Sequence, residues 1–436
     1  MAVIDLGEHY DELSLDAEPR RGWRITRGFR VGVVLALLLV TVTAGAPPRQ
    51  PVPELVVPAG REASLTVAED RLFLTELSSP DRGITALRAG DGRRLWRLPA
   101  PAGVVLSVIG VVAQRLIVLA TPEVEGPSET MALDPATGAV SWRHLAAFRG
   151  WGVESDLLLR TEPSDQEPVT LVSVAADSGR IRWSQPIPGG AEPVHQDDAV
   201  TSSRIVLGLS GRRAEVREGS SGRLVQAIGP PVRQPQAPDD HSRFPGVVGD
   251  LLFVAGGPDE VVAYGLDRLD HRWTARESGL TPDGFFACGS ILCHLSLQAG
   301  LRGIDPATGQ TRWVLPQLPV AWPVGDRLVA SEAGFPAADS LMVLDPATGR
   351  RLGGLGRWAV LGMLPGLPGS RSLLGVRYTT DGQVWFARLD PATVTARIEL
   401  VTRGSIGGCE IRAGGDAEVL VCRRPDWAFR LWRLPG

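Results

Sequence analysis

The sequence contains no lysine, and all 45 of its basic residues are arginine. Against 49 acidic residues the formal net charge is −4, so the chain lacks the basic excess of nucleic-acid-binding proteins. The G-x-S-x-G elbow, the phosphate-binding P-loop and the H-E-x-x-H helix are also absent. A Ser/His/Asp triad stays open, because its members need not be close in sequence. We predict no catalytic residue, no metal site, no cofactor and no nucleic-acid partner.

Long apolar runs are scarce, and the one that stands out is "VGVVLALLLVTVTAGA" at residues 31–46. It is shorter than the ~20 residues of a typical spanning helix, but Phe29 and a snorkelling Arg30 can extend it. Five arginines between Arg20 and Arg30 place the preceding segment in the cytoplasm. A cleavable signal peptide ending at Ala44–Ala46 is the competing interpretation. The long, partly acidic leading segment and two following prolines favour a retained anchor.

The predicted organisation is therefore a disordered cytoplasmic tail at 1–30, a transmembrane anchor at 31–46 and a Pro-rich linker at 47–53. Residues 54–436 form the extracytoplasmic domain, where disulfides are chemically permitted. Four cysteines allow three pairings. Sequence proximity favours Cys288 with Cys293 and Cys409 with Cys422, each pair across one hairpin.

The four-residue string "DPAT" recurs four times, which indicates an internal repeat. Aligned on this phrase, eight segments follow one another at 38–49 residues, the period of a four-stranded propeller blade. The position of the aspartate is held by Arg88, Asp134, Ala175, Glu218, Asp267, Asp305, Asp345 and Asp390.

Each phrase is typical of a tight turn between two strands. Asp accepts hydrogen bonds from turn amides, Pro fixes φ, and Gly takes the positive φ that other residues resist. A tryptophan eight residues after the aspartate position is expected to pack between neighbouring blades. Four copies show it most clearly: Trp96, Trp142, Trp183 and Trp313.

The phrase resembles the repeat of the PQQ-like β-propellers, a superfamily that includes quinoprotein dehydrogenases and an outer-membrane assembly lipoprotein. The resemblance covers roughly residues 54–436 and implies an all-β propeller, preceded here by one transmembrane helix. Eight phrases predict eight blades. The C-terminal stretch adds three further strands, and "ELVVPAG" at 54–60 is expected to supply the fourth, which would make nine blades possible.

A quinone site in this family would place an adjacent cysteine pair over the cofactor, and this chain has none. Cys288 and Cys293, in "CGSILC", are therefore predicted to form a structural disulfide, or to be two buried thiols, rather than a redox site. "HQDD" from His195 and "PDDH" from Pro238 would ligate a metal only if their loops met, and polar loop tips are the simpler interpretation. The turn-rich insertion at 229–245 is either a functional loop or a tolerated one.

The sequence thus predicts a single-pass membrane protein whose extracytoplasmic propeller is a non-catalytic binding or scaffolding module. Its partner would be a protein or a cell-envelope polymer. The alternative is a propeller enzyme, either an atypical quinone or metal oxidoreductase or a hydrolase. A lipobox cysteine near the anchor is absent, so the family's role in outer-membrane assembly is not transferred.

Overall fold

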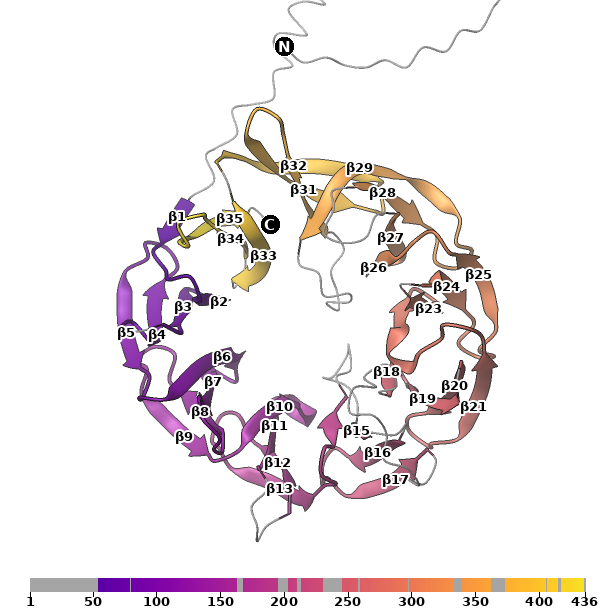
Figure 1. The fold of residues 1–436 in the computed structure, drawn as a ribbon, viewed down its shortest axis with the longest axis horizontal. Helices are drawn as coiled ribbons and strands as arrows, with labels where there is room; N and C mark the ends of the chain where they lie inside the picture. Colours follow the sequence, from indigo (N-terminus) through magenta and orange to yellow (C-terminus); the bar gives the residue numbers. More distant parts are fainter. Residues whose placement is uncertain are drawn as a thin grey trace, which may run out of the picture. The chain divides into compact units, whose positions relative to one another are not determined.

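The computed structural model describes residues 54–434 except positions 79, 163–167, 195–202, 210–212, 230–244, 258, 297, 333–338, 362–372, 405, 415 and 416. The predicted tail, anchor and linker lie outside the described residues. Val52–Gly436 forms one compact unit, in which antiparallel sheets follow one another around a ring (Figure 1). The predicted all-β architecture is confirmed, and it is consistent with a β-propeller.

Six sheets each contain four consecutive strands in simple up-and-down order. The first three are β2 (Ser64–Ala68), β3 (Arg71–Glu76), β4 (Gly83–Arg88) and β5 (Arg94–Pro99); β6 (Val104–Val112), β7 (Arg115–Pro122), β8 (Glu129–Leu133) and β9 (Val140–His144); and β10 (Ala147–Trp151), β11 (Leu157–Arg160), β12 (Thr170–Val174) and β13 (Ile181–Pro186). The next three are β14 (Glu192–Pro193), β15 (Arg204–Leu209), β16 (Arg213–Glu218) and β17 (Leu224–Ile228); β18 (Gly246–Val248), β19 (Leu251–Gly257), β20 (Glu260–Gly265) and β21 (His271–Arg276); and β22 (Phe285–Cys288), β23 (Ile291–Ser296), β24 (Gly300–Ile304) and β25 (Thr311–Leu315).

A seventh sheet has seven strands because one long strand belongs to two groups. β29 pairs with β28 through residues 351–358 and with β30 through residues 359–361. The structure describes seven four-stranded sheets and this seven-stranded one, which makes eight sheets. If the long sheet is divided at β29 and this strand is counted in both parts, there are nine four-stranded groups. The blade number thus depends on how β29 is counted. The strands are β26 (Val320–Val324), β27 (Arg327–Ser331), β28 (Asp339–Leu344), β29 (Arg351–Leu361), β30 (Leu373–Tyr378), β31 (Gln383–Asp390) and β32 (Thr395–Arg403).

The ring is closed by a sheet that joins the two ends of the compact unit. β33 (Gly407–Gly414), β34 (Ala417–Arg423) and β35 (Phe429–Leu434) pair with β1 (Glu54–Val57), which completes the sheet as its outer strand. This is the role predicted for "ELVVPAG". The Arg430 guanidinium donates to both carboxylate oxygens of Glu54 at 2.7 Å, so an ion pair reinforces the closing ladder.

Among the described residues, two single 3₁₀ turns lie between strands, η1 (Val153–Ser155) and η3 (Pro282–Gly284). Within the described residues, no helix is both long and apolar enough to cross a membrane.

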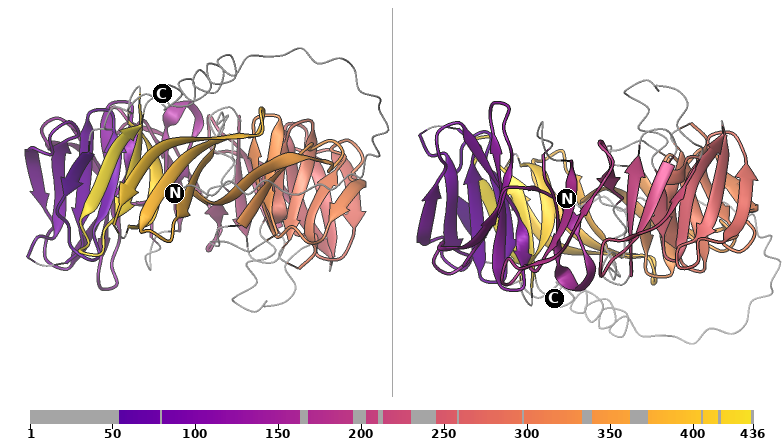
Figure 2. Two further views of the ribbon diagram at one scale, coloured as in Figure 1. Left: turned by 90° about the horizontal axis from the view of Figure 1, so that it is seen from above. Right: turned by 90° about the horizontal axis from the view of Figure 1, so that it is seen from below.

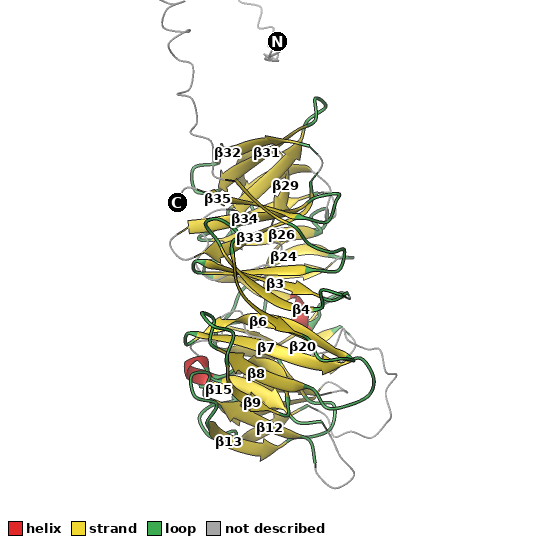
Figure 3. Ribbon diagram, turned by 90° about the vertical axis from the view of Figure 1, so that its left-hand side faces the viewer, coloured by secondary structure: helices red, strands yellow, loops and turns green. Residues whose placement is uncertain are grey.

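The loops gather at the two ends of the strands, which run between the two faces of the ring (Figures 2 and 3). Because each four-stranded group is an antiparallel meander, its first and third connections lie at one end and its second connection lies at the other. We call the end bearing the predicted phrases the turn face. The opposite end, which also carries the links to the next group, is the loop face.

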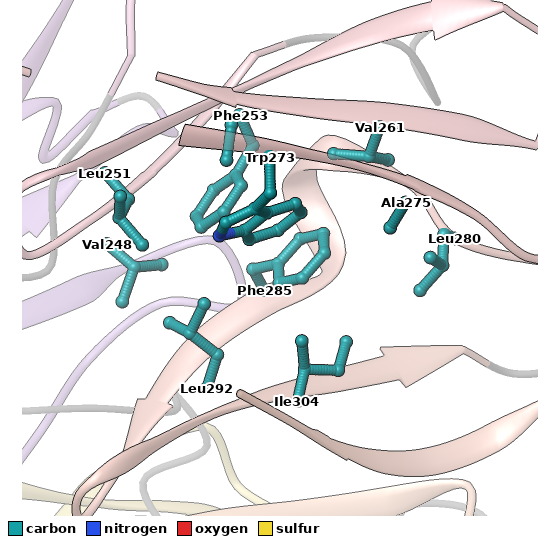
Figure 4. Close-up of a cluster of buried hydrophobic side chains, with 11 residues drawn as sticks. Val248, Leu251, Phe253, Val261, Trp273, Ala275, Leu280, Phe285, Leu292 and Ile304 are labelled. Atoms are coloured by element: carbon teal, nitrogen blue, oxygen red, sulfur yellow. The ribbon is translucent and has the colours of Figure 1, made fainter. Parts of the chain in front are cut away.

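The core lies between adjacent sheets. In one seam the rings of Phe253 and Phe285 stack with centroids 4.3 Å apart, although they come from β19 and β22 of neighbouring sheets (Figure 4). Trp273 packs beside them, with its ring centroid 5.8 Å from that of Phe253. A sheet that could not bury both faces alone is thus covered by its neighbours.

Candidate functional site

The predicted aspartates are held by the turns in which they lie. Asp134 Oδ1 accepts hydrogen bonds from the amides of Ala136 at 2.8 Å and Thr137 at 3.0 Å, and these bonds lower the pKa of Asp134. In the other three "DPAT" copies the aspartate Oδ1 likewise accepts a hydrogen bond from the amide two residues later. Its distances are 2.8 Å at Asp305, 3.0 Å at Asp345 and 2.9 Å at Asp390.

The spaced tryptophans join each sheet to the next one. The Trp96 indole N–H donates to the Pro135 carbonyl at 2.9 Å, in the phrase of the following sheet. The ring also covers Gly138 of that phrase, where a Cβ would lie 2.7 Å from the indole. The same pair of contacts recurs at four other seams: Trp142 with Ala176 and Gly179, Trp183 with Gly219 and Gly222, Trp273 with Pro306 and Gly309, and Trp313 with Pro346 and Gly349.

At two seams both the tryptophan and the opposing glycine are replaced. Gly353 holds the tryptophan position on β29, and it meets Val394, whose φ is 54°, in the next phrase. A Cβ on Gly353 would lie 2.6 Å from Val394 Cγ1. On β17 the position is held by Gln226, and Leu269 at φ 55° stands in the glycine position of the next phrase. At the Gly353 seam the large side chain thus comes from the phrase instead of from the outer strand.

The backbone hydrogen bonds of the turns correct the predicted alignment at one phrase. In the fifth phrase Gly265, not Asp267, occupies the aspartate position, because its N–H and C=O bond to Asp270 and Leu269 as Asp134 bonds to Ala139 and Gly138. Trp273 then lies eight residues later, as in the other copies. Leu269 in place of the usual glycine had concealed this register.

All four cysteines form disulfides. Cys288 is joined to Cys293 across β22 and β23, and Cys409 to Cys422 across β33 and β34, with Cα–Cα distances of 5.8 and 4.0 Å. In the second hairpin Ile411 pairs with Leu420.

The loops considered for metal binding lie outside the described residues, as do His195 and His241. Across the part of the chain that the structure describes, no three His, Cys, Asp or Glu residues form a group that could hold a metal ion. A pocket of about 230 Å³ lies at the turn face between the first two sheets, beside Arg71, Arg115 and Asp134. These charges already have partners: Arg71 pairs with Asp70, and Arg115 donates to the Asp177 carbonyl. The pocket shows no catalytic arrangement.

The loop face carries a partly exposed aromatic side chain. Trp427 lies between β34 and β35, is 43% exposed and has φ 69°. A bulky residue at positive φ costs roughly 1–2 kcal/mol. The Arg61 guanidinium lies 5.4 Å from the centre of its ring, a cation–π arrangement.

Neighbouring contacts hold these two side chains in place. Trp427 N–H donates to the Arg424 carbonyl at 3.0 Å, which closes the turn. The Arg423 side chain lies 4.2 Å from the Phe429 ring centre and donates to the carbonyls of Gly60 and Arg61 at 2.6 and 2.8 Å. The loop bearing Arg61 is thereby fixed to the strand that leads into Trp427. We call Arg61, Arg424 and Trp427 the Trp427 surface.

Sequence reasoning missed the Trp427 surface. Trp427 does not follow the eight-residue spacing of the seam tryptophans, and it stands in "RRPDWAFR", directly after a Pro-Asp turn signal. That context could have separated it from the others. Its contact with Arg61 could not be read from the sequence, because the two residues meet only through ring closure.

Comparison with known proteins supports the predicted repeat. Residues 49–155 match the family model of the outer membrane protein assembly factor BamB. The resemblance to PQQ-like propeller repeats is therefore confirmed. No curated protein matches the sequence.

Two solved structures illustrate the similarity of fold. BamB from Moraxella catarrhalis is 12% identical, with 88% of this chain and 99% of that chain covered and a TM-score of 0.43. The computationally designed Ika8 protein is 12% identical, with 87% and 99% covered and a TM-score of 0.46. At these values neither structure bears on what the chain binds.

Proposed function

We propose that the chain is a membrane-anchored, extracytoplasmic β-propeller that acts as a non-catalytic binding or scaffolding module in the cell envelope. Residues 31–46 would be the anchor, and the ring would present its loops to a partner. The match of residues 49–155 to the BamB family model supports a protein-interaction role.

The observation that carries the proposal is the Trp427 surface. A tryptophan that is 43% exposed at positive φ, with an arginine against its ring, is costly to maintain without a partner. Trp and Arg are the residue types most enriched among side chains that dominate binding energy. A protein partner therefore fits better than a cell-envelope polymer.

The two disulfides support the extracytoplasmic side, because such bonds persist in oxidising compartments. The arginines between positions 20 and 30 favour a cytoplasmic N-terminus, which places the propeller across the membrane from them.

Affinity capture of the full-length protein from cross-linked cells tests the proposal. We expect Trp427→Ala to reduce the captured partner by about 30-fold, the effect of losing a side chain worth 2 kcal/mol. Leu145→Ala is the matched control. Leu145 is 66% exposed on a connection of the same face, and it is not part of the Trp427 surface. Equal recovery of partners by both variants and the parent would contradict the proposal.

A further inference from the structure

β17 differs from every other outer strand that the structure describes. Its sequence, "LVQAI", has neither a charged residue nor a proline. The other outer strands all carry charge: Arg94 and Arg97 on β5, Arg143 on β9, Arg182 on β13, His271, Arg272 and Arg276 on β21, Arg312 on β25, Arg351 and Arg357 on β29, Arg397, Glu399 and Arg403 on β32, and Glu54 on β1.

The apolar side chains of β17 are also exposed. Leu224 and Val225 are 46% and 42% exposed, and Gln226 and Ala227 are exposed as well, so only Ile228 is buried. The strand ends its sheet and pairs on one edge with β16. Charges and prolines are the usual devices that prevent an edge strand from pairing with another chain. β17 lacks both devices, and its bulge against β16, a third such device, is shared by the outer strands β5, β9, β13, β21 and β25.

We propose that β17 pairs antiparallel with β17 of a second copy of this chain, which joins two sheets into one across a two-fold axis. An isologous contact brings the same patch of each copy together, so the strand must be complementary to itself. On a charged outer strand such pairing brings like charges of the two copies onto the same short joined segment. β17 alone among the described outer strands avoids this repulsion.

The sequence fits one register, in which the paired residue numbers sum to 452. Gln226 then faces Gln226 of the second copy, and the two side-chain amides can exchange hydrogen bonds. Val225 faces Ala227 on one side of the joined sheet. β17 has a bulge against β16 between Leu224 and Gln226, so the regular pairing is limited to Val225, Gln226 and Ala227, and Arg223 lies outside the paired segment.

The contact area of the proposed dimer is small, so its affinity should be low. Three regularly paired residues span about 10 Å and bury far less than the ~1,200 Å² of a stable complex. We therefore expect a weak dimer, with a dissociation constant of about 10 µM or more. This surface is separate from the Trp427 surface, and the inference stands whether or not a partner binds there.

Cysteine cross-linking of the full-length protein tests the register. The native cysteines are all in disulfides, so a new thiol is the only free one among the described residues. Gln226→Cys should form a disulfide-linked dimer on a non-reducing gel, since directly opposed residues lie within disulfide range. Val225→Cys and Ala227→Cys should each stay monomeric alone but cross-link when mixed, because each faces the other across the dyad.

Two further variants separate pairing from chance collision and from misfolding. Ser141→Cys places a thiol on the exposed charged outer strand β9 and should cross-link at least about tenfold less than Gln226→Cys. Val225→Arg should abolish the concentration-dependent dimer in sedimentation velocity while it leaves the thermal midpoint unchanged. Cross-linking of Gln226→Cys no faster than that of Ser141→Cys, or a wild-type protein that stays monomeric at about 100 µM, would overturn the proposal.

Discussion

At the seam of Gly353 and Val394 the glycine is on the outer strand and the larger side chain is in the phrase, the reverse of Trp313 and Gly349. We therefore expect the effects of substitutions at these two positions on stability to be strongly coupled. We consider Gly353→Trp, Val394→Gly and the double substitution that restores the arrangement of Trp313 and Gly349. In the double variant the indole would cover the new glycine and donate to the Pro391 carbonyl, as Trp313 donates to Pro346 at 2.9 Å.

The magnitudes follow from the contacts. Gly353→Trp alone forces its Cβ to within 2.6 Å of Val394 Cγ1, and overpacking of this kind costs about 1–3 kcal/mol. Val394→Gly alone relieves about 1–2 kcal/mol of positive-φ strain but loses a similar amount of packing, so its net effect is small. The double variant removes the overlap and adds ring burial and one hydrogen bond. We expect a coupling free energy of about 2–3 kcal/mol.

Thermal unfolding of the four full-length proteins measures this coupling, since 1 kcal/mol shifts the midpoint by about 2 °C in a chain of this size. The reverse exchange is the control: Gly349→Val should clash with Trp313, and adding Trp313→Gly should rescue much of the loss. Additive effects at both seams would refute the reasoning that tryptophan and glycine act as one unit.

Three further predictions concern other parts of the chain. His294 is buried with its Nε2 3.0 Å from the Thr281 amide, and loss of hydration lowers its pKa to about 4. Because its pKa is about 6.5 in the unfolded chain, the contribution of His294 to the free energy of unfolding is constant above pH 6.5 and falls by about 3 kcal/mol between pH 6.5 and 4. His294→Gln should flatten this decline when unfolding is measured as a function of pH. An unchanged profile would contradict the assignment. Replacing Cys409 and Cys422 by serine should destabilise the ring-closing sheet by about 3 kcal/mol in denaturant unfolding, because a closed loop of this length is released, and an unaltered midpoint would be the adverse result. The anchor should be retained, so N-terminal sequencing of the membrane-bound protein should not yield a chain that begins at Pro47.

The repeat could be predicted from the sequence because its physical requirements are local. An Asp that binds the amides two and three residues on, and a Gly at positive φ, leave a fixed spelling such as "DPATG". The strand in "ELVVPAG" could be assigned to the closing sheet because the C-terminal stretch supplies three strands and a blade needs a fourth. These features need little knowledge of distant residues.

The remaining features depend on contacts between distant segments. Leu269 stands where a glycine was expected, and this replacement displaced the predicted alignment by two residues, from Gly265 to Asp267. The continuous β29 could not be foreseen, since its two ends pair with different neighbours. The exposure of Trp427 and its contact with Arg61 likewise depend on the tertiary arrangement.

Photo-cross-linking from position 427 in intact cells is the measurement that tests the binding role most directly. A photoreactive phenylalanine analogue at Trp427 keeps an aromatic side chain on the loop face, and the same analogue at Leu145 is the matched control. The account predicts one discrete protein adduct from position 427 that is absent from position 145. No adduct at position 427, or the same adducts from both positions, would contradict it.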